Sequence, residues 1–328
     1  MRIVVMRHAW WIAVSGLLVI AAGLVVVAAA RAAQSRETVA TETLSEEAER
    51  EVRAEEHDKP SAFEHVMDAA FLHFFDTFGP RPRLPRIASL QLTKFMILEV
   101  IAAALVMAIY IPMARRSQSG EPPRGGWQNA FESLLTFIRD EVAKPSLGEH
   151  EADRYLPFLW TLFLFILFCN LLGMLPFLGS PTASIYVTGA LALCALVAIP
   201  TAAIAKMGVV PYLKSLWPHL DIPIPVFGFV IKLLICVIEI LGTFIKCAVL
   251  AVRLFANMFA GHMVLATIML FVVLAANVAF GLWMTVTIGS VLGVVALSFL
   301  ELFVAFLQAY VFVFLTALFM GMAVHPQH

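Results

Sequence analysis

The sequence predicts an all-α, polytopic membrane protein. Of its 328 residues, 61% are hydrophobic and only 14% are charged, a balance that a water-soluble domain with a solvated surface does not sustain. The apolar residues form runs that are long enough, as helices, to cross a hydrocarbon core of about 30 Å. The formal net charge of −1 provides no basic field, so nucleic-acid binding is not expected.

The first 33 residues combine Arg2 and Arg7 with an apolar run and a small-residue exit. Such a segment is either a cleaved signal peptide or an extra transmembrane helix, and both interpretations stay open. In either case residues 34–91 are expected to be exported. That segment is acidic and ends in an amphipathic stretch, where His65 and His73 have no third ligand at helical spacing, so no metal site is predicted.

The remaining residues, 92–328, are predicted to form the membrane domain, with about five core transmembrane helices. Three apolar segments, at residues 92–113, 156–178 and 185–207, each have the length of one span. The polar residues 114–155 contain an amphipathic stretch, FESLLTFIRDEVAK, and are expected to lie flat on one membrane face.

The last two apolar segments, residues 225–275 and 281–322, are too long for simple spans. A helix of roughly 45 residues is about 68 Å long, against a hydrocarbon core of about 30 Å. We therefore expect these helices to be steeply tilted, bent, or each broken into two pieces.

Basic residues predict the orientation of the chain. Counting spans from an inside start places residues 34–91 outside, and places the loops at 114–155 and 207–224 and the C-terminus in the cytoplasm. Arg115, Arg116, Lys206 and Lys214 then lie on the inner side, in agreement with the positive-inside rule.

Four ionisable residues recur every seven positions in the first long segment: Lys232, Glu239, Lys246 and Arg253. Each step drifts by only about 20° on a helix, so they share one face. Two of them need no functional role: Lys232 is expected near the membrane interface, and the long side chain of Lys246 can extend toward it. Arg253 has apolar sequence on both sides, where a cation costs about 2.5 to 3.5 kcal/mol or more. Because arginine stays charged at cellular pH, we expect it to control protons on neighbouring carboxylates.

Other polar residues accompany Arg253. Asn257 lies one turn further and shares its face, whereas His262 is expected on the opposite side unless the helix bends. In the last segment, Glu301 and Gln308 are seven residues apart and share a face. Because the two segments run antiparallel, Glu301 is expected at the depth of His262, and Gln308 near that of Arg253. A histidine–glutamate pair serves either as a proton relay or as a bond between two helices.

Two segments, RLFANMFAGH and LELFVAFLQAYVF, together with PFLWTLFLFILFCNLLGMLP and EILGTFIKCAVLAVRL, resemble subunit a of F-type ATP synthases. The resemblance extends over about residues 92–322. It implies a bacterial inner-membrane protein that conducts protons and whose last two helices form a long, tilted hairpin. The implied partners are a rotating ring of c subunits, the b subunits and the F1 sector.

The resemblance also implies roles for single residues. Arg253 is the essential arginine opposite the rotor carboxylate, and Gln308 stands beside it. The outer half-channel is lined by Asn257, His262 and Glu301, and the inner one by Glu239, with Lys246 as an auxiliary polar group.

Other function classes receive less support from the sequence. A secondary transporter with an intramembrane charge relay is the main alternative, but such proteins show two related halves with interrupted helices, and no internal repeat is present. There is no HExxH and no GxxxxGK[ST] motif, so the chain is not expected to be catalytic alone or to bind nucleotide. The four cysteines form neither CxxC nor CxxH pairs, and we expect no cofactor or metal.

Overall fold

The computed structural model describes residues 86–87, 90–91, 94–119, 126–175, 179–215, 217, 225–275 and 280–325. The predictions for residues 1–33, for His65 and His73, and for most of the exported segment lie outside these residues. The described chain is almost entirely helical, which confirms the predicted all-α class. Its extended residues are the short antiparallel pair β1 (Arg86–Ile87) and β2 (Leu90–Gln91).

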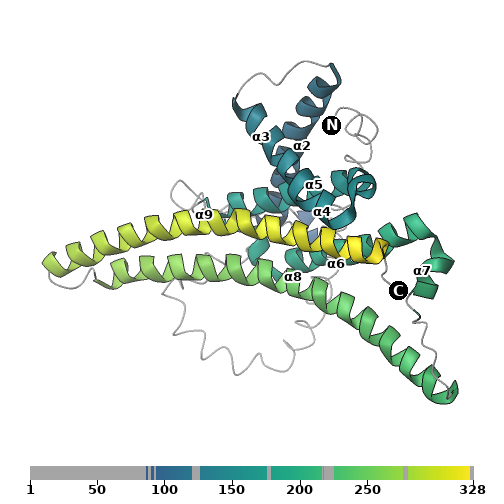
Figure 1. Cartoon of the computed structure of the whole chain (residues 1–328). Coiled ribbons are helices and arrows are strands. Elements are labelled where there is room, and N and C mark those ends of the chain that lie inside the picture. The colour runs from purple at the N-terminus through teal and green to yellow at the C-terminus, as the bar shows by residue number, and fades with distance from the viewer. Residues whose placement is uncertain are drawn as a thin grey trace.

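The helices follow one another as in the sequence (Figure 1). They are α2 (Lys94–Ser119), α3 (Gly126–Phe137), the π-helical turn η2 (Ile138–Ala143), α4 (Lys144–Leu147), α5 (Glu149–Gly173), the 3₁₀ turn η3 (Pro181–Ala183), α6 (Ile185–Met207), α7 (Val209–Ser215), α8 (Pro225–Ala275) and α9 (Phe280–Val324). Four of them, α5, α6, α8 and α9, are long and apolar enough to cross a membrane, and α2 has a shorter apolar part, Phe95–Ile111.

Some predicted helix ends differ from the observed ones. Helix α2 continues past residue 113 to Ser119, and α5 begins at Glu149 rather than at residue 156. The segment 114–155 therefore contains several helices instead of one long loop. Hydropathy marks the membrane-embedded part of a helix, whereas backbone hydrogen bonds continue into polar sequence until a breaker occurs. Gly148, with φ 81°, is such a breaker before α5.

The two long helices are each continuous, with 51 residues in α8 and 45 in α9. The alternative that each is broken into two pieces is therefore wrong. They run side by side in opposite directions, and α8 curves away from α9 toward its N-terminal end (Figure 1). At about 1.5 Å per residue, neither fits across a 30 Å hydrocarbon core along the membrane normal, so both must be bent or tilted.

Helix α5 forms the centre of the packed core. It contacts α2, α9 and η2, while α6 packs on both α8 and α9. The indole nitrogen of the buried Trp160 donates a hydrogen bond to the carbonyl oxygen of Leu135 over 2.9 Å, which fixes α3 to α5. Of the most hydrophobic stretch of α5, 78% is buried within the chain, compared with 11% for α8 and 17% for α9. Within the described residues, the most hydrophobic stretches of α8 and α9 therefore remain mostly exposed.

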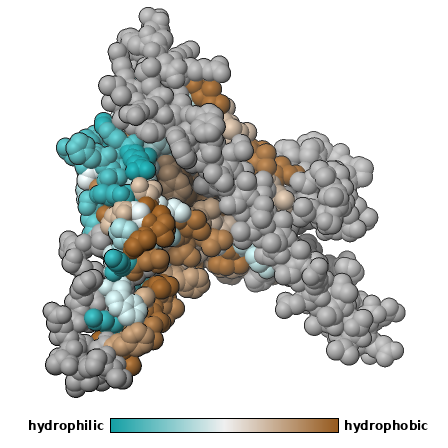
Figure 2. Space-filling model, turned by 90° about the vertical axis from the view of Figure 1, so that its right-hand side faces the viewer, coloured by the Kyte–Doolittle hydropathy of each residue, from teal (hydrophilic) through white to brown (hydrophobic). Residues whose placement is uncertain are grey.

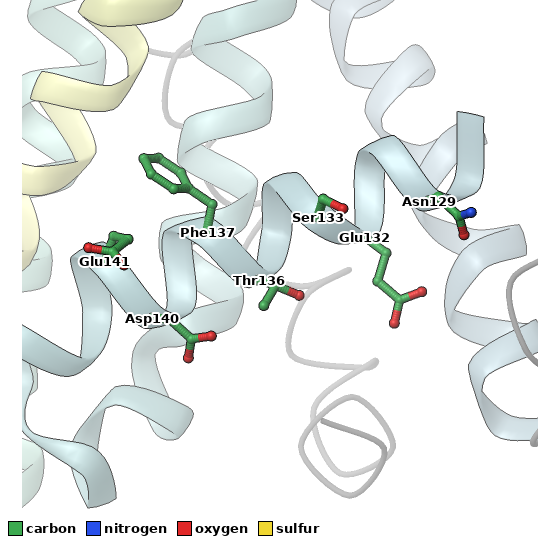
Figure 3. A pocket seen from close by; sticks show the side chains of 7 residues that line it. All are labelled: Asn129, Glu132, Ser133, Thr136, Phe137, Asp140 and Glu141. Carbon is green, nitrogen blue, oxygen red and sulfur yellow. The ribbon is translucent and has the colours of Figure 1, made fainter. Parts of the chain in front are cut away.

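Helix α3 and the turn η2 form one amphipathic unit, as the sequence predicted. Figure 3 shows Glu132, Thr136 and Asp140 projecting to one side of this unit and Phe137 to the other. The residues along it line an open depression of about 500 Å³, beside which Asp140 forms an ion pair with Lys144 at 2.6 Å. No residue of α8 or α9 lines this depression, so it is separate from the intramembrane charges.

Candidate functional site

Arg253 projects from α8 outside the face that packs on the rest of the chain. The buried face of α8 around it is formed by Leu250, Leu254 and Met258, whereas Arg253 itself is exposed. Among the described residues, none forms a hydrogen bond or an ion pair with its guanidinium. Within the described part of the chain, the charge is thus held on an apolar helix without a counter-charge.

The side chain of Asn257, one turn beyond Arg253, reaches α9. Its amide nitrogen donates a hydrogen bond of 2.8 Å to the side-chain oxygen of Gln308. Gln308 is buried, with 2% of its surface exposed. This contact confirms the expectation that Gln308 lies close to the level of Arg253.

His262 and Glu301 form a second polar contact between the same two helices. The Nδ1 atom of His262 lies 3.6 Å from Oε1 of Glu301, and their side chains are only 13% and 8% exposed. The expectation that these residues share one depth is therefore confirmed. Protonation of the imidazole would make this contact an ion pair.

Helical geometry explains why Asn257 and His262 both meet α9. The buried residues Leu250, Leu254 and Met258 define the direction of α8 toward the core. On an ideal helix, Asn257 lies about 60° to one side of that direction and His262 about 80° to the other, and Arg253 lies about 100° from it. The two polar side chains therefore reach α9 from opposite flanks of α8, while the arginine points away.

Glu239 and Lys246 line a cavity of about 870 Å³ in the region where α8 diverges from α9. Its lining comes from several helices and includes the polar residues Tyr212, Ser215, Thr243 and His325. The ammonium group of Lys246 lies 5.2 Å from the ring centroid of Phe319, an attraction that directs the charge toward α9. The seven-residue stripe therefore divides: Glu239 and Lys246 face this cavity, and Arg253 lies further along α8.

Two further observations characterise the cavity. Burial raises the pKa of the Tyr212 hydroxyl above its ordinary value, and the nearby Glu239 carboxylate raises it further. At the rim, the ammonium group of Lys206 lies 3.2 Å from His325 and 3.5 Å from Glu151.

Figure 2 shows the end of the molecule that is on the right in Figure 1, where hydrophilic residues gather beside hydrophobic surface.

A buried polar network next to Glu301 was not anticipated from the sequence. The amide of Asn170 donates to the carbonyl oxygen of Ala305 over 3.1 Å, and it accepts a hydrogen bond of 2.7 Å from the Thr182 hydroxyl. The hydroxyls of Thr182 and Ser180 are also 2.7 Å apart. Because Ala305 lies one turn after Glu301, the network ties this part of α9 to α5 and η3. An asparagine within an apolar span was the signal that could have indicated it.

Within the described ranges, no cluster of three or more His, Cys, Asp or Glu side chains is placed to hold a metal ion. Cys169, Cys194, Cys236 and Cys247 all have free thiols. The candidate site thus consists of an exposed arginine, two polar contacts between α8 and α9, and a cavity lined in part by Glu239 and Lys246.

Comparisons with known proteins place this arrangement in context. Residues 96–321 match the family model described as ATP synthase A chain. The chain is 41% identical over 247 residues to ATP synthase subunit a of Myxococcus xanthus, covering 73% of this chain and 75% of that protein. It is 39% identical over 248 residues to ATP synthase subunit a of Anaeromyxobacter dehalogenans, covering 75% of this chain and 61% of that protein. It is 35% identical over 285 residues to ATP synthase subunit a 2 of Chlorobaculum tepidum, covering 83% and 74%. Every candidate site residue, from Glu239 to Gln308, lies within the matched range.

Proposed function

The chain belongs to the ATP synthase A chain family, and on this premise we propose that it is the proton-conducting stator subunit of the F0 sector. In this proposal two half-channels and Arg253 couple proton movement to rotation of a ring of c subunits. The b subunits and the F1 sector complete the complex, and this chain carries out no catalysis alone. The proposal also puts the chain in the inner membrane of a bacterium, with residues 34–91 exported and the C-terminus in the cytoplasm.

The observation that carries the proposal is the position of Arg253. It is an exposed cation without a partner among the described residues, on a helix whose most hydrophobic stretch is only 11% buried. Holding such a charge at membrane depth is costly, by about 2.5 to 3.5 kcal/mol or more. A neighbouring protein with an intramembrane carboxylate would offset this cost, as a c subunit does in the proposal.

The outer half-channel is assigned to the His262–Glu301 contact. A proton that arrives from outside passes these two groups and neutralises a carboxylate of the ring, which can then face lipid at a lower cost. Their separation of 3.6 Å and their low exposure support a relay that has little contact with lipid. Asn257 and Gln308, joined by a 2.8 Å hydrogen bond, lie between this pair and the level of Arg253.

The inner half-channel is assigned to the cavity lined by Glu239 and Lys246. When a carboxylate of the ring arrives at Arg253, the fixed positive charge favours its ionised form, so its proton is released toward this cavity. The cavity volume of about 870 Å³ is enough for many water molecules, each of which takes about 30 Å³ in the liquid. Because arginine does not give up its own proton, it also prevents a direct leak between the two half-channels.

Replacement of Arg253 by alanine tests the proposal. The variant complex should assemble, but ATP-driven proton pumping in inverted membrane vesicles should fall to background. Thr267→Ala is a matched control, since the Thr267 hydroxyl bonds only to Met263 of its own helix, at 2.8 Å, and is exposed. Normal pumping by the Arg253 variant would refute the proposed role of this residue.

A further inference from the structure

Gly261 of α8 lies directly against the carboxyl group of Glu301. A Cβ atom at Gly261 would be 2.9 Å from Oε1, 3.4 Å from Cδ and 3.7 Å from Cγ of that side chain. The first distance is shorter than a carbon–oxygen contact tolerates without movement. The carboxyl group of Glu301 therefore occupies space that is open because residue 261 has no side chain.

The other described glycines differ from Gly261. At Gly173 and Gly321 an added Cβ would overlap Ser180 and the backbone carbonyl of Ser146, respectively, so backbone would have to move. At Gly189 no heavy atom lies within 4 Å of the added carbon. Among the described glycines, Gly261 is the position where an added methyl group meets the end of an acidic side chain.

We propose that Gly261 is a positioning residue, whose missing side chain sets where the Glu301 carboxyl group lies relative to His262. The inference rests on the proposed function, since it gives this placement a role in proton passage. The distance of 3.6 Å between His262 Nδ1 and Glu301 Oε1 is only slightly longer than a hydrogen bond of about 2.7 to 3.2 Å. A displacement of a few tenths of an ångström therefore decides whether a proton moves directly or needs a bridging water.

The contact geometry separates this role from a purely structural one. The atom that an added methyl group would meet is the far end of a flexible side chain, so Glu301 can turn aside without moving either backbone. The Gly261→Ala variant should therefore fold and assemble, because alanine is also the better helix former. What changes is the position of the carboxyl group.

The experiment compares Gly261→Ala with Gly189→Ala in the whole complex, in membrane vesicles. Both variants should reach the membrane at the wild-type level, and Gly189→Ala should show wild-type proton-driven ATP synthesis. Gly261→Ala should slow this reaction by about tenfold, because misplacing a reacting group by up to about 1 Å has effects of that order or larger. Equal rates in the two variants would overturn the inference.

A second variant tests the geometry itself. Combining Gly261→Ala with Glu301→Asp shortens the acidic side chain by one methylene group and removes the overlap. The double variant should be faster than Gly261→Ala alone, whereas a role of Gly261 that does not involve Glu301 predicts no such recovery. Absence of recovery, or loss of both variants from the membrane, would overturn the inference.

A third variant, Glu301→Gln, separates failure of this inference from failure of the proposed function. If Glu301→Gln slows proton-driven synthesis and Gly261→Ala does not, only the positioning role of Gly261 is refuted. If Glu301→Gln leaves synthesis unchanged, Glu301 is not part of the proton path, and both the proposed outer half-channel and the positioning role fail.

Discussion

Replacement of Asn170 by alanine should loosen the part of α9 that carries Glu301. The side chain of Asn170 is fully buried, donates to the carbonyl oxygen of Ala305 and accepts from the Thr182 hydroxyl. Both hydrogen bonds are lost in the variant. The Thr182 hydroxyl keeps Ser180 as a neighbour at 2.7 Å, so it is not left without a partner.

The expected cost follows from these contacts. Hydrogen bonds between transmembrane helices contribute about 0.6 kcal/mol on average and up to about 1.7 kcal/mol. Two such bonds, with the rest of the network still paired, give a loss of about 1 to 2 kcal/mol in the free energy of unfolding. A larger loss of stability would require that the variant leave a buried polar group without a hydrogen bond, and the Thr182 hydroxyl still has Ser180 as its partner.

A double-mutant cycle isolates the part of this loss that comes from the Asn170–Thr182 hydrogen bond. Asn170→Ala, Thr182→Ala and the combined variant would be compared by detergent-induced unfolding of the purified complex. The coupling energy should be about 0.6 kcal/mol or more. Thr201→Ala is the control, because the exposed Thr201 hydroxyl bonds only to its own helix at 2.9 Å. Additive effects of the two replacements, or a loss no larger than that of the control, would refute this explanation of the network.

Two further predictions concern other parts of the chain. Gly321→Ala should strongly reduce the amount of assembled complex in membranes, because the new carbon overlaps the Ser146 carbonyl, while Gly189→Ala should not; equal amounts on a membrane immunoblot would contradict this. The pKa of the Tyr212 hydroxyl is raised above 10.0 in the folded chain. The neutral hydroxyl therefore stabilises the folded state fully below pH 10.0, and this stabilisation is lost as the pH rises through the pKa of the folded state. Tyr212→Phe should lose less thermal stability than the wild type above pH 10.0 and keep almost the same melting temperature at neutral pH; an identical loss in the variant and the wild type would contradict the assignment.

The sequence predicted the membrane helices well where their ends coincide with the ends of apolar sequence. Helices α6 and α8 begin and end at the predicted residues. The predictions failed for the ends of α2 and α5, where helix continues into polar sequence or stops early. Helix α5 ends at Gly173, where the glycine lies against Ser180 and a proline follows at position 176. Hydropathy does not register such contacts.

The candidate site was predicted in part, for a related reason. Spacing along a helix gives the relative directions of side chains, so the common levels of His262 and Glu301, and of Gln308 and Arg253, followed from the antiparallel order. Which direction faces the core depends on tertiary packing. Sequence spacing alone therefore could not predict that Asn257 and His262 flank the buried face of α8, or that Gly261 makes room for a carboxyl group.

The surroundings of Arg253 show how its charge can be matched from outside the chain. Apart from Asn257, which reaches α9, the exposed residues on its flank one turn before and one turn after Arg253 are Val249 and Ala256, and neither is larger than valine. Short side chains at this position let another helix approach closely. A carboxylate about 4 Å from the guanidinium contributes about 4 kcal/mol at an effective dielectric constant near 20. That attraction is comparable with the cost of about 2.5 to 3.5 kcal/mol for a buried cation. In the proposed function, a carboxylate of the ring beside Arg253 would therefore offset the cost of holding this cation.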